Sequence, residues 1–161
     1  MSKLLVPKSL LIVVFIALIG MQFFQPDRKE PLTRDTDEIF AVLPADEEVV
    51  ALIKSSCFDC HSNNTDYPWY ASASPISWWL QEQVDEGREV LNFSEWTKYE
   101  LQKAAHKLEE CFKEVAMGSM PLSEYTWIHG DARLSETQRA RLAGWFKLSK
   151  RKMSGQTPPE Q

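Results

Sequence analysis

The sequence predicts a mainly α-helical protein: one domain with long loops, preceded by one N-terminal transmembrane helix. Three observations predict it. The chain has 161 residues, a length that suits a single domain. A long uncharged apolar run lies near the N-terminus. Beyond this run, no segment alternates apolar and polar residues with the two-residue period of a strand, whereas several segments carry helix caps and helical periodicity.

The N-terminal run, Leu10 to Met21, is almost continuously apolar and follows Lys3 and Lys8. A positively charged start before an apolar stretch is typical of an export signal. Leu4 to Phe24 reaches the length of about 20 residues that a spanning helix needs. No small-x-small cleavage site follows. We therefore expect residues 1–26 to be an uncleaved signal anchor; a cleaved signal peptide and a buried core helix are the alternatives.

The rest of the chain divides by composition. Residues 27–44 have mixed charge, several prolines and no sustained apolar period, which predicts a tether. Residues 45–150 hold the aromatic and helical segments and form the predicted domain. Residues 151–161 are rich in Gly and Pro and are expected to be a flexible tail.

The helices expected in the domain have recognisable start and stop signals. In chain order they are a short helix from the acidic turn at 45–48 into Cys57, a helix from Pro75 to a stop at Gly87, a longer helix capped by Ser94 or Thr97 and ending at Gly118, and a helix from the S-x-x-Q capping box at Ser135 to about Lys150.

The longer helix has a predictable apolar face. At 100° per residue, Leu108 and Val115 fall within roughly 60° of Leu101, which we take as the centre of that face. Cys111 falls at its margin. His106 and Met117 fall on the opposite side of the helix, so both are expected to be exposed.

Charge excludes one class of partner. Of the 18 basic residues, two lie in the first 26 residues, which hold no acid, so the remainder carries 16 basic against 23 acidic residues, a net charge of −7. Nucleic-acid binding needs clustered Lys and Arg to neutralise phosphates. We therefore expect no nucleic-acid partner.

One motif carries chemistry: Cys57-Phe58-Asp59-Cys60-His61, or C-x-x-C-H. Two thiols at this spacing can form thioethers with the two vinyl groups of one haem, and the adjacent imidazole can then bind the iron. The motif thus predicts covalent haem c with His61 as the proximal ligand, in a cytochrome-c-like helical domain. A thioredoxin-like redox site, a zinc site that includes Cys111 and a structural disulfide are the competing interpretations.

A six-coordinate haem needs a distal ligand, and four residues are candidates: Met120, Met117, His106 and His129. Met120 follows the expected helix stop and precedes a proline, which restricts the backbone and can hold a thioether in place. We favour Met120. His129, His106 and an iron with an open position remain alternatives.

Several spaced motifs resemble those of the bacterial haem-binding-domain family of CxxCH proteins, over about residues 40–150. The similar segments are Cys57 to Tyr70, Pro75 to Trp78, Glu86 to Arg88, Asn92 to Trp96, Met120 to Leu122 and Tyr125. The resemblance implies a monohaem c-type cytochrome domain, often linked with other cytochromes or di-haem peroxidases, and matches Met120 to the family's Met-Pro position. It implies no role for Cys111.

These observations together predict a membrane-anchored c-type cytochrome of the bacterial inner membrane, with its domain in the periplasm. It would carry electrons through one covalently bound haem c, without catalysis, to redox proteins with basic docking surfaces. The alternatives are a peroxidase-associated or gas-sensing haem domain with an open iron position, and a zinc or structural Cys-His module. A peroxidase would need a distal His or Glu above the iron, and no such arrangement is recognisable in the sequence.

Overall fold

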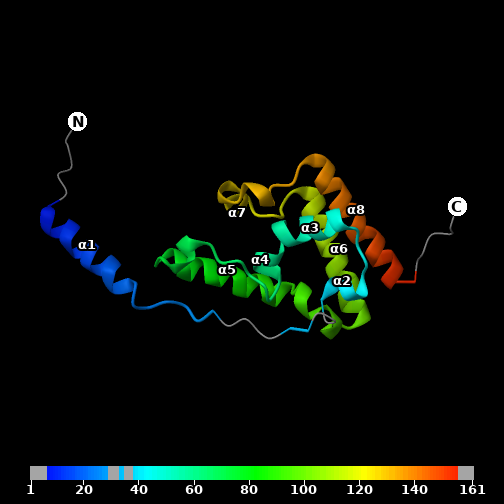
Figure 1. The fold of residues 1–161 in the computed structure, drawn as a ribbon, viewed down its shortest axis with the longest axis horizontal. Helices are drawn as coiled ribbons and strands as arrows, with labels where there is room; N and C mark the ends of the chain where they lie inside the picture. Colours follow the sequence, from blue (N-terminus) through cyan, green and yellow to red (C-terminus); the bar gives the residue numbers. More distant parts are fainter. Residues whose placement is uncertain (1–6, 29–32, 35–37, 156–161) are drawn as a thin grey trace.

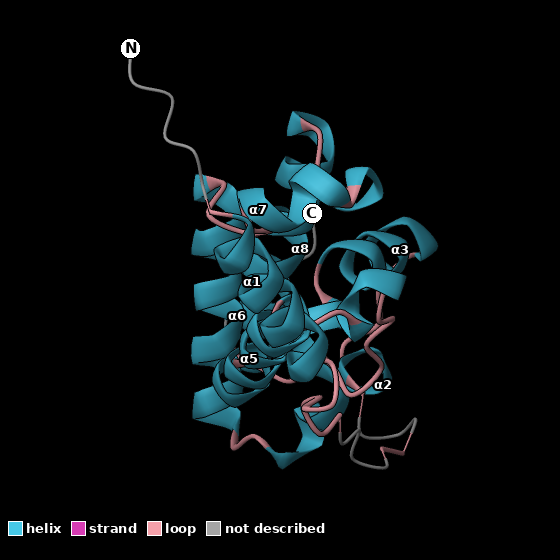
Figure 2. Ribbon diagram, turned by 90° about the vertical axis from the view of Figure 1, so that its left-hand side faces the viewer, coloured by secondary structure: helices cyan, strands magenta, loops and turns pink. Residues whose placement is uncertain are grey.

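The computed structural model describes residues 7–28, 33–34 and 38–155, and within them all regular structure is helical (Figures 1 and 2). The mainly helical prediction is confirmed. The elements, in chain order, are α1 (Lys8–Met21), α2 (Ile39–Val42), α3 (Glu47–Ser56), α4 (Phe58–His61), the 3-10 helix η2 (Trp69–Ser72), α5 (Ile76–Val90), the 3-10 helix η3 (Phe93–Lys98), α6 (Leu101–Met117), α7 (Ser123–Ile128), the 3-10 helix η4 (Gly130–Ala132) and α8 (Glu136–Met153).

The N-terminal transmembrane helix predicted for Leu4 to Phe24 is wrong. α1 has 14 residues, which gives a length of about 21 Å against a hydrocarbon core of about 30 Å. Within the described part of the chain, no helix is both long enough and apolar enough to cross a bilayer. The helix begins only after the extended backbone of Pro7 and ends at Gln22, whose side chain bonds to the domain. Residues 1–6 of the predicted anchor lie outside the described residues.

The segment after α1 is attached to the domain beside η2 and the start of α5. The Gln22 amide donates to the Ser74 carbonyl at 2.9 Å, and the Ser74 N–H donates back to Gln22 Oε1 at 3.0 Å. The Trp78 indole N–H donates to the Phe24 carbonyl at 2.6 Å. Arg28 lies 4.6 Å above the Tyr67 ring. These contacts fix where α1 leaves the domain, and α1 itself projects outward with no buried residue (Figure 1).

The core lies between α6, α8, α3 and the short helices α2, α4 and η3. Phe93 is at its centre, with its ring stacked on those of Phe58, Trp96 and Phe146 at centroid distances of 5.9, 6.3 and 6.4 Å. Ile39 of α2 is fully buried in the same core, so the core includes residues before position 45. Because Phe58 belongs to α4, this aromatic stack fixes the C-x-x-C-H turn to the domain.

Helix ends follow the sequence signals at Gly118 and Ser135 and depart from them elsewhere. The predicted cap of α6 by Ser94 or Thr97 is wrong, because both residues lie in η3 and α6 begins at Leu101 after Glu100. Gly118 ends α6 in the left-handed conformation at φ 79°, and Ser135 forms the predicted capping box with Gln138. Gly87, expected to stop a helix, lies inside α5, which continues to Val90. α8 extends to Met153, and the rest of the expected tail, residues 156–161, lies outside the described residues.

Candidate cofactor site

The C-x-x-C-H motif occupies the junction of two helices. α3 ends at Cys57, whose φ of −131° interrupts the helical backbone, and α4 is the single turn that follows. The His61 N–H donates to the Cys57 carbonyl at 2.9 Å, which closes this turn. Both cysteines and the histidine are therefore presented by one turn of backbone, with Phe58 of the same turn anchored in the core.

His61 is oriented for ligation through one ring nitrogen. Its Nδ1 lies 2.9 Å from the Gly87 carbonyl and 3.1 Å from the Leu91 carbonyl, both at the end of α5. Two carbonyl acceptors place the proton on Nδ1 and leave the lone pair on Nε2, the arrangement typical of metal-binding histidines. Burial lowers the pKa of His61, against the opposite effect of the two hydrogen bonds. The ring is therefore neutral, as a ligand must be.

Gly87 brings α5 against this turn. A Cβ built on Gly87 would lie 2.5 Å from the Cys60 carbonyl oxygen and 3.1 Å from the Cys60 Cβ, closer than any side chain can approach. The missing side chain thus lets the Gly87 carbonyl come within hydrogen-bond distance of His61. The close contact between α5 and the C-x-x-C-H turn thus accounts for a glycine at position 87, in the interior of α5.

Two cavities of about 270 and 300 Å³ meet at the motif. Together they fall within the usual size range of ligand pockets. Residues that line both are Ser56, Cys57, His61, Val90 and Met120. Cys60 lines the second cavity only. The walls are mostly apolar, so the space suits a flat apolar group held between His61 and Met120.

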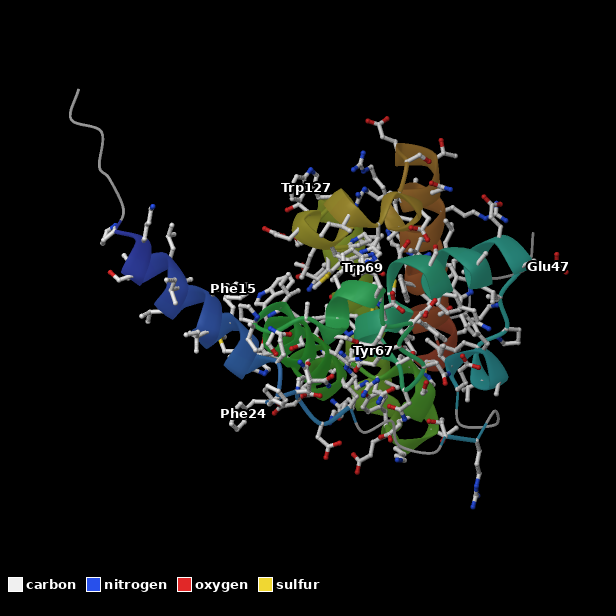
Figure 3. All side chains as sticks on the ribbon, turned by 60° about the vertical axis from the view of Figure 1, so that its left-hand side comes forward. Phe15, Phe24, Glu47, Tyr67, Trp69 and Trp127 are labelled. Atoms are coloured by element: carbon white, nitrogen blue, oxygen red, sulfur yellow. The ribbon has the colours of Figure 1, made fainter. Side chains whose placement is uncertain are left out.

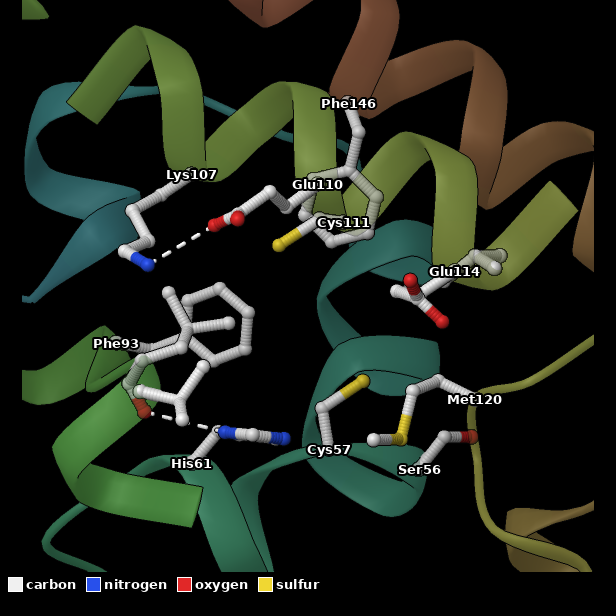
Figure 4. Close-up of a pocket in the computed structure, with 13 residues that line it drawn as sticks. Ser56, Cys57, His61, Phe93, Lys107, Glu110, Cys111, Glu114, Met120 and Phe146 are labelled. Atoms are coloured by element: carbon white, nitrogen blue, oxygen red, sulfur yellow. Dashed lines mark hydrogen bonds and ion pairs between the residues drawn. The ribbon is translucent and has the colours of Figure 1, made fainter. Parts of the chain in front are cut away.

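Met120 reaches the cavities from the loop after α6. Its backbone N–H donates to the Glu114 carbonyl at 3.2 Å. Arg139 of α8 donates from Nη1 to the Met120 carbonyl at 3.1 Å and to the Val115 carbonyl at 2.8 Å. Figure 4 shows the Met120 sulfur in the same cavity as the Cys57 sulfur and the His61 ring. Hydrogen bonds to α6 and from α8 therefore fix the backbone of the loop at Met120.

The other distal candidates lie elsewhere. His106 is exposed and lies 3.3 Å from Glu110, and Met117 is 69% exposed. His129 uses both ring nitrogens, with Nε2 at 3.0 Å from the Tyr70 hydroxyl and Nδ1 at 3.1 Å from the Tyr125 carbonyl. Neither histidine lines a cavity that His61 lines. Of the four candidates, the structure brings only Met120 to the motif.

The three cysteines share one environment. Burial raises the pKa of Cys57 to about 12 and that of Cys60 to about 11, and also raises the pKa of Cys111. All three are protonated thiols at neutral pH. Cys111 lies in the wall of the first cavity, opposite Cys57 (Figure 4). In the described residues, no three Cys, His, Asp or Glu side chains converge to form a metal site of their own.

Sequence reasoning missed the residues that α6 contributes to the site. Lys107, Glu110 and Glu114 line the first cavity beside Cys111. The expected face was centred on Leu101, which is 62% exposed, whereas the buried face is rotated from it by about 50° at 100° per residue. The helix packs against α8, and the position of α8 could not be predicted from the α6 sequence alone.

A further network holds the chain after the motif. Arg88 donates from Nε to the Ser62 carbonyl and from Nη2 to the Thr65 hydroxyl, each at 2.8 Å. The Tyr125 hydroxyl donates to the Asp59 carboxylate inside the motif. Burial raises the pKa of Tyr125, ahead of the effect of this carboxylate. Tyr125 therefore remains a donor that ties α7 to α4.

The residues fit a haem. Two thiols, an imidazole whose Nε2 makes no hydrogen bond in the described chain, and the Met120 thioether all line the two mostly apolar cavities. The fold and site therefore define a small all-helical haem-binding protein. The chain matches the Haem-binding domain family model over residues 16–148 and belongs to that family. No curated protein and no solved structure matches it.

Proposed function

We propose that this haem-binding protein is a monohaem c-type cytochrome that carries electrons. The observation that supports it best is the arrangement of His61 and Met120 about the same two cavities. Cys57 and Cys60 would hold the haem through thioethers, and His61 and Met120 would bind its iron. The His61 ring is held by two carbonyls of α5, and the backbone of Met120 is held by Glu114 and Arg139, so little reorganisation accompanies a change of charge at the site.

The haem, when bound, supplies an iron that exchanges one electron. The chain's own residues orient it and tune it. A thioether ligand raises the reduction potential of the iron relative to ligation by two histidines. The apolar walls also influence this potential, because they limit the access of water to the site. The functional surface of this electron carrier would be the exposed edge of the haem.

The proposed partner is a redox protein with a basic surface, such as another cytochrome or a di-haem peroxidase. The exposed acids Glu82, Asp85 and Glu89 of α5 line a surface hollow together with Glu86, which also lines the second cavity. Trp69 and Trp127 project from η2 and α7 and are 87% and 82% exposed (Figure 3). Clustered carboxylates and exposed tryptophans both suit contact with Lys- or Arg-rich surfaces.

We propose a periplasmic location. Covalent attachment of haem through cysteine thioethers belongs outside the reducing cytosol. The apolar N-terminal segment behind two lysines is typical of an export signal. Fractionation of cells into cytosol, periplasm and membranes, with detection of covalent haem in each fraction, tests this proposal. Haem-bearing protein in the cytosol would contradict it.

A second candidate is a haem domain with an open iron position that reacts with peroxide or binds a diatomic gas. One observation favours it: Glu114 lines the first cavity together with Met120 (Figure 4). A carboxyl group near the distal position could exchange protons with a bound peroxide. Displacement of Met120 from the iron would be required first, so the two candidates differ in the coordination of the reduced protein.

One spectroscopic experiment separates the candidates. The full chain is produced with the haem-maturation machinery, and its absorption spectrum is recorded in both oxidation states. We expect covalent haem c, a weak far-red band from sulfur-bound ferric iron and no carbon monoxide binding. The Met120→Ala variant should lose the band and bind carbon monoxide, whereas the exposed control Met117→Ala should keep the wild-type spectrum. Carbon monoxide binding by the wild type would favour the open-iron candidate, and a chain without covalent haem would overturn the proposal.

A further inference from the structure

α6 presents a charged stripe to the first cavity. Lys107, Glu110, Cys111 and Glu114 all line it, and their spacing of three and four residues places them on one face of the helix. Figure 4 shows this stripe above His61 and Cys57, with Lys107 at the end farthest from Met120. A charged stripe is unexpected in a wall that is otherwise mostly apolar.

Lys107 differs from the other charged residues of the walls. The acids that line the two cavities are Asp59, Glu86, Glu110 and Glu114. Among all the residues that line either cavity, Lys107 is the one lysine or arginine. Nearby arginines are engaged elsewhere: Arg88 with the chain after the motif, and Arg139 with the carbonyls of the Met120 loop. An anion placed in the first cavity therefore has Lys107 as its local cation.

The Lys107 side chain has capacity for another anion. It is 15% exposed, and its Nζ lies 2.9 Å from Glu110 Oε2. An ammonium group has three donors, and no second acceptor within the described chain takes one of them. The other carboxylate oxygen of Glu110 lies 3.3 Å from His106 Nε2. Glu110 would therefore keep its contact with His106 if the Lys107 ammonium group turned toward another carboxylate.

Haem itself carries carboxylates that Lys107 could bind. Its two propionate groups lie on the edge of the ring opposite the two vinyl groups. Cys57 and Cys60 fix the vinyl edge, and Cys60 lines the second cavity only, whereas Lys107 lines the first only. We infer that Lys107 binds a haem propionate at the α6 end of the first cavity. This inference rests on the proposed covalent attachment of haem through the two cysteines.

Two electrostatic effects favour the pairing of Lys107 with a haem propionate. A propionate brought into a mostly apolar cavity that Glu110 and Glu114 also line is unfavourable without a cation, and a charge-assisted hydrogen bond to Lys107 offsets that cost. A positive charge beside the haem also disfavours the ferric state, which carries one more positive charge than the ferrous state. Lys107 therefore raises the reduction potential as well as positioning the ring.

The test compares two variants of the holoprotein with matched charge changes on α6. Lys107→Gln removes the proposed cation, and Lys113→Gln removes a lysine that is 56% exposed and pairs with Glu109. We expect both to attach haem and keep sulfur ligation. Only Lys107→Gln should lower the reduction potential and shift the propionate bending band in the resonance Raman spectrum. Lys107→Arg, which keeps the charge, should restore both towards wild type.

A second pair of variants keeps Lys107 in place. Glu110→Gln releases Lys107 from its competing carboxylate, so the propionate bending band should shift in the direction opposite to that of Lys107→Gln. Glu109→Gln, with the same charge change outside the cavity, should leave the band unchanged. Identical Raman spectra and potentials in Lys107→Gln and Lys113→Gln, or an unshifted band in Glu110→Gln, would overturn the inference. Covalent haem in these same proteins would leave the proposed function standing, whereas its absence from the wild type would remove the proposed function.

Discussion

The carbonyl of Gly87 accepts a hydrogen bond from His61 Nδ1 at 2.9 Å, and it can do so because Gly87 has no side chain. The Cβ of any other residue would lie 2.5 Å from the Cys60 carbonyl oxygen. One residue of α5 therefore sets the distance between α5 and the C-x-x-C-H turn and, together with the Leu91 carbonyl, holds the His61 ring through Nδ1. The protein alone thus orients the His61 side chain that we propose as an iron ligand.

Gly87→Ala should separate α5 from α4 and weaken the haem site. Inserting a methyl group where the backbone is already in contact costs about 1–3 kcal/mol of folding free energy. We expect lower thermal stability and a lower yield of covalent haem per chain, measured by calorimetry and by absorbance after denaturation. Gly144→Ala is the control, because a Cβ there meets no atom within 4 Å; this change should stabilise α8 by about 0.5–1 kcal/mol. Equal haem yield in both variants would contradict the proposed contact.

Local features of the chain could be predicted from the sequence more readily than contacts between distant residues. C-x-x-C-H is a local motif, and a motif of five residues is visible in any chain that contains it. Gly118 and the Ser135 capping box are local for the same reason, since each acts on the backbone within a few residues. Met120 was identified from its local Met-Pro step, and the structure does bring it to the cavities that His61 lines.

The errors involve contacts between distant residues. The chain leaves α1 at Gln22, which bonds to Ser74, 52 positions away, and hydropathy alone cannot show such a contact. Gly87 was predicted to stop a helix because glycine commonly does so. Its actual role, the close approach to Cys60 on another helix, depends on a contact that the local sequence does not show. The rotation of α6 that exposes Leu101 and turns Lys107 toward the cavity depends on how α8 packs against it. Tertiary packing decided each of these cases.

Arg139 should hold Met120 in place without touching the iron. Arg139→Gln removes the hydrogen bonds to the Val115 and Met120 carbonyls, with an expected cost of about 1.5 kcal/mol for bonds from a charged donor. We expect a weaker far-red sulfur band and measurable carbon monoxide binding by the ferrous protein. Arg141→Gln, on the same helix but paired with Asp46 and Glu48, should leave both unchanged. A wild-type spectrum in Arg139→Gln would show that the loop keeps its position without this arginine.

Cys111 should take no part in haem attachment, although it lines the first cavity. Mass spectrometry of the holoprotein should find both thioethers retained in Cys111→Ala. Cys57→Ala and Cys60→Ala should each keep a single thioether and show a red-shifted band in the reduced spectrum, because one vinyl group remains conjugated with the ring. Loss of covalent haem in Cys111→Ala would assign this thiol a role in attachment.

Gln22 should fix the direction in which α1 leaves the domain. Gln22→Ala removes both hydrogen bonds with Ser74, so the Ser74 amide should exchange its hydrogen faster, by at least several-fold. Phe23→Ala is the control, since Phe23 is 83% exposed. The absorption spectrum should stay the same in both variants because neither residue lines the haem cavities. Unchanged exchange at Ser74 in Gln22→Ala would show that the segment is held by other contacts.

Glu109 should make the α6–α8 contact sensitive to acid. Its carboxylate lies 2.7 Å from Lys150 of α8 and 3.1 Å from Lys113. The hydrogen bonds from these two lysines lower the pKa of Glu109 from 4.5 to about 2. A carboxyl group with a lowered pKa stabilises the folded state above its unfolded value, and this contribution is lost as the pH falls toward the folded value.

The melting temperature of the wild type should therefore exceed that of Glu109→Gln by a small, constant amount above about pH 5, and the difference should shrink to zero as the pH falls from about 4.5 to 2. Effects of acid on the haem site are common to both proteins and cancel in the comparison. Glu89→Gln, an exposed α5 residue without an ion pair in the described chain, should show no such pH dependence. Added salt should reduce the difference at neutral pH, because exposed ion pairs are screened. A difference that persists at pH 2 would assign the stabilisation to packing of the Glu109 side chain and not to its charge.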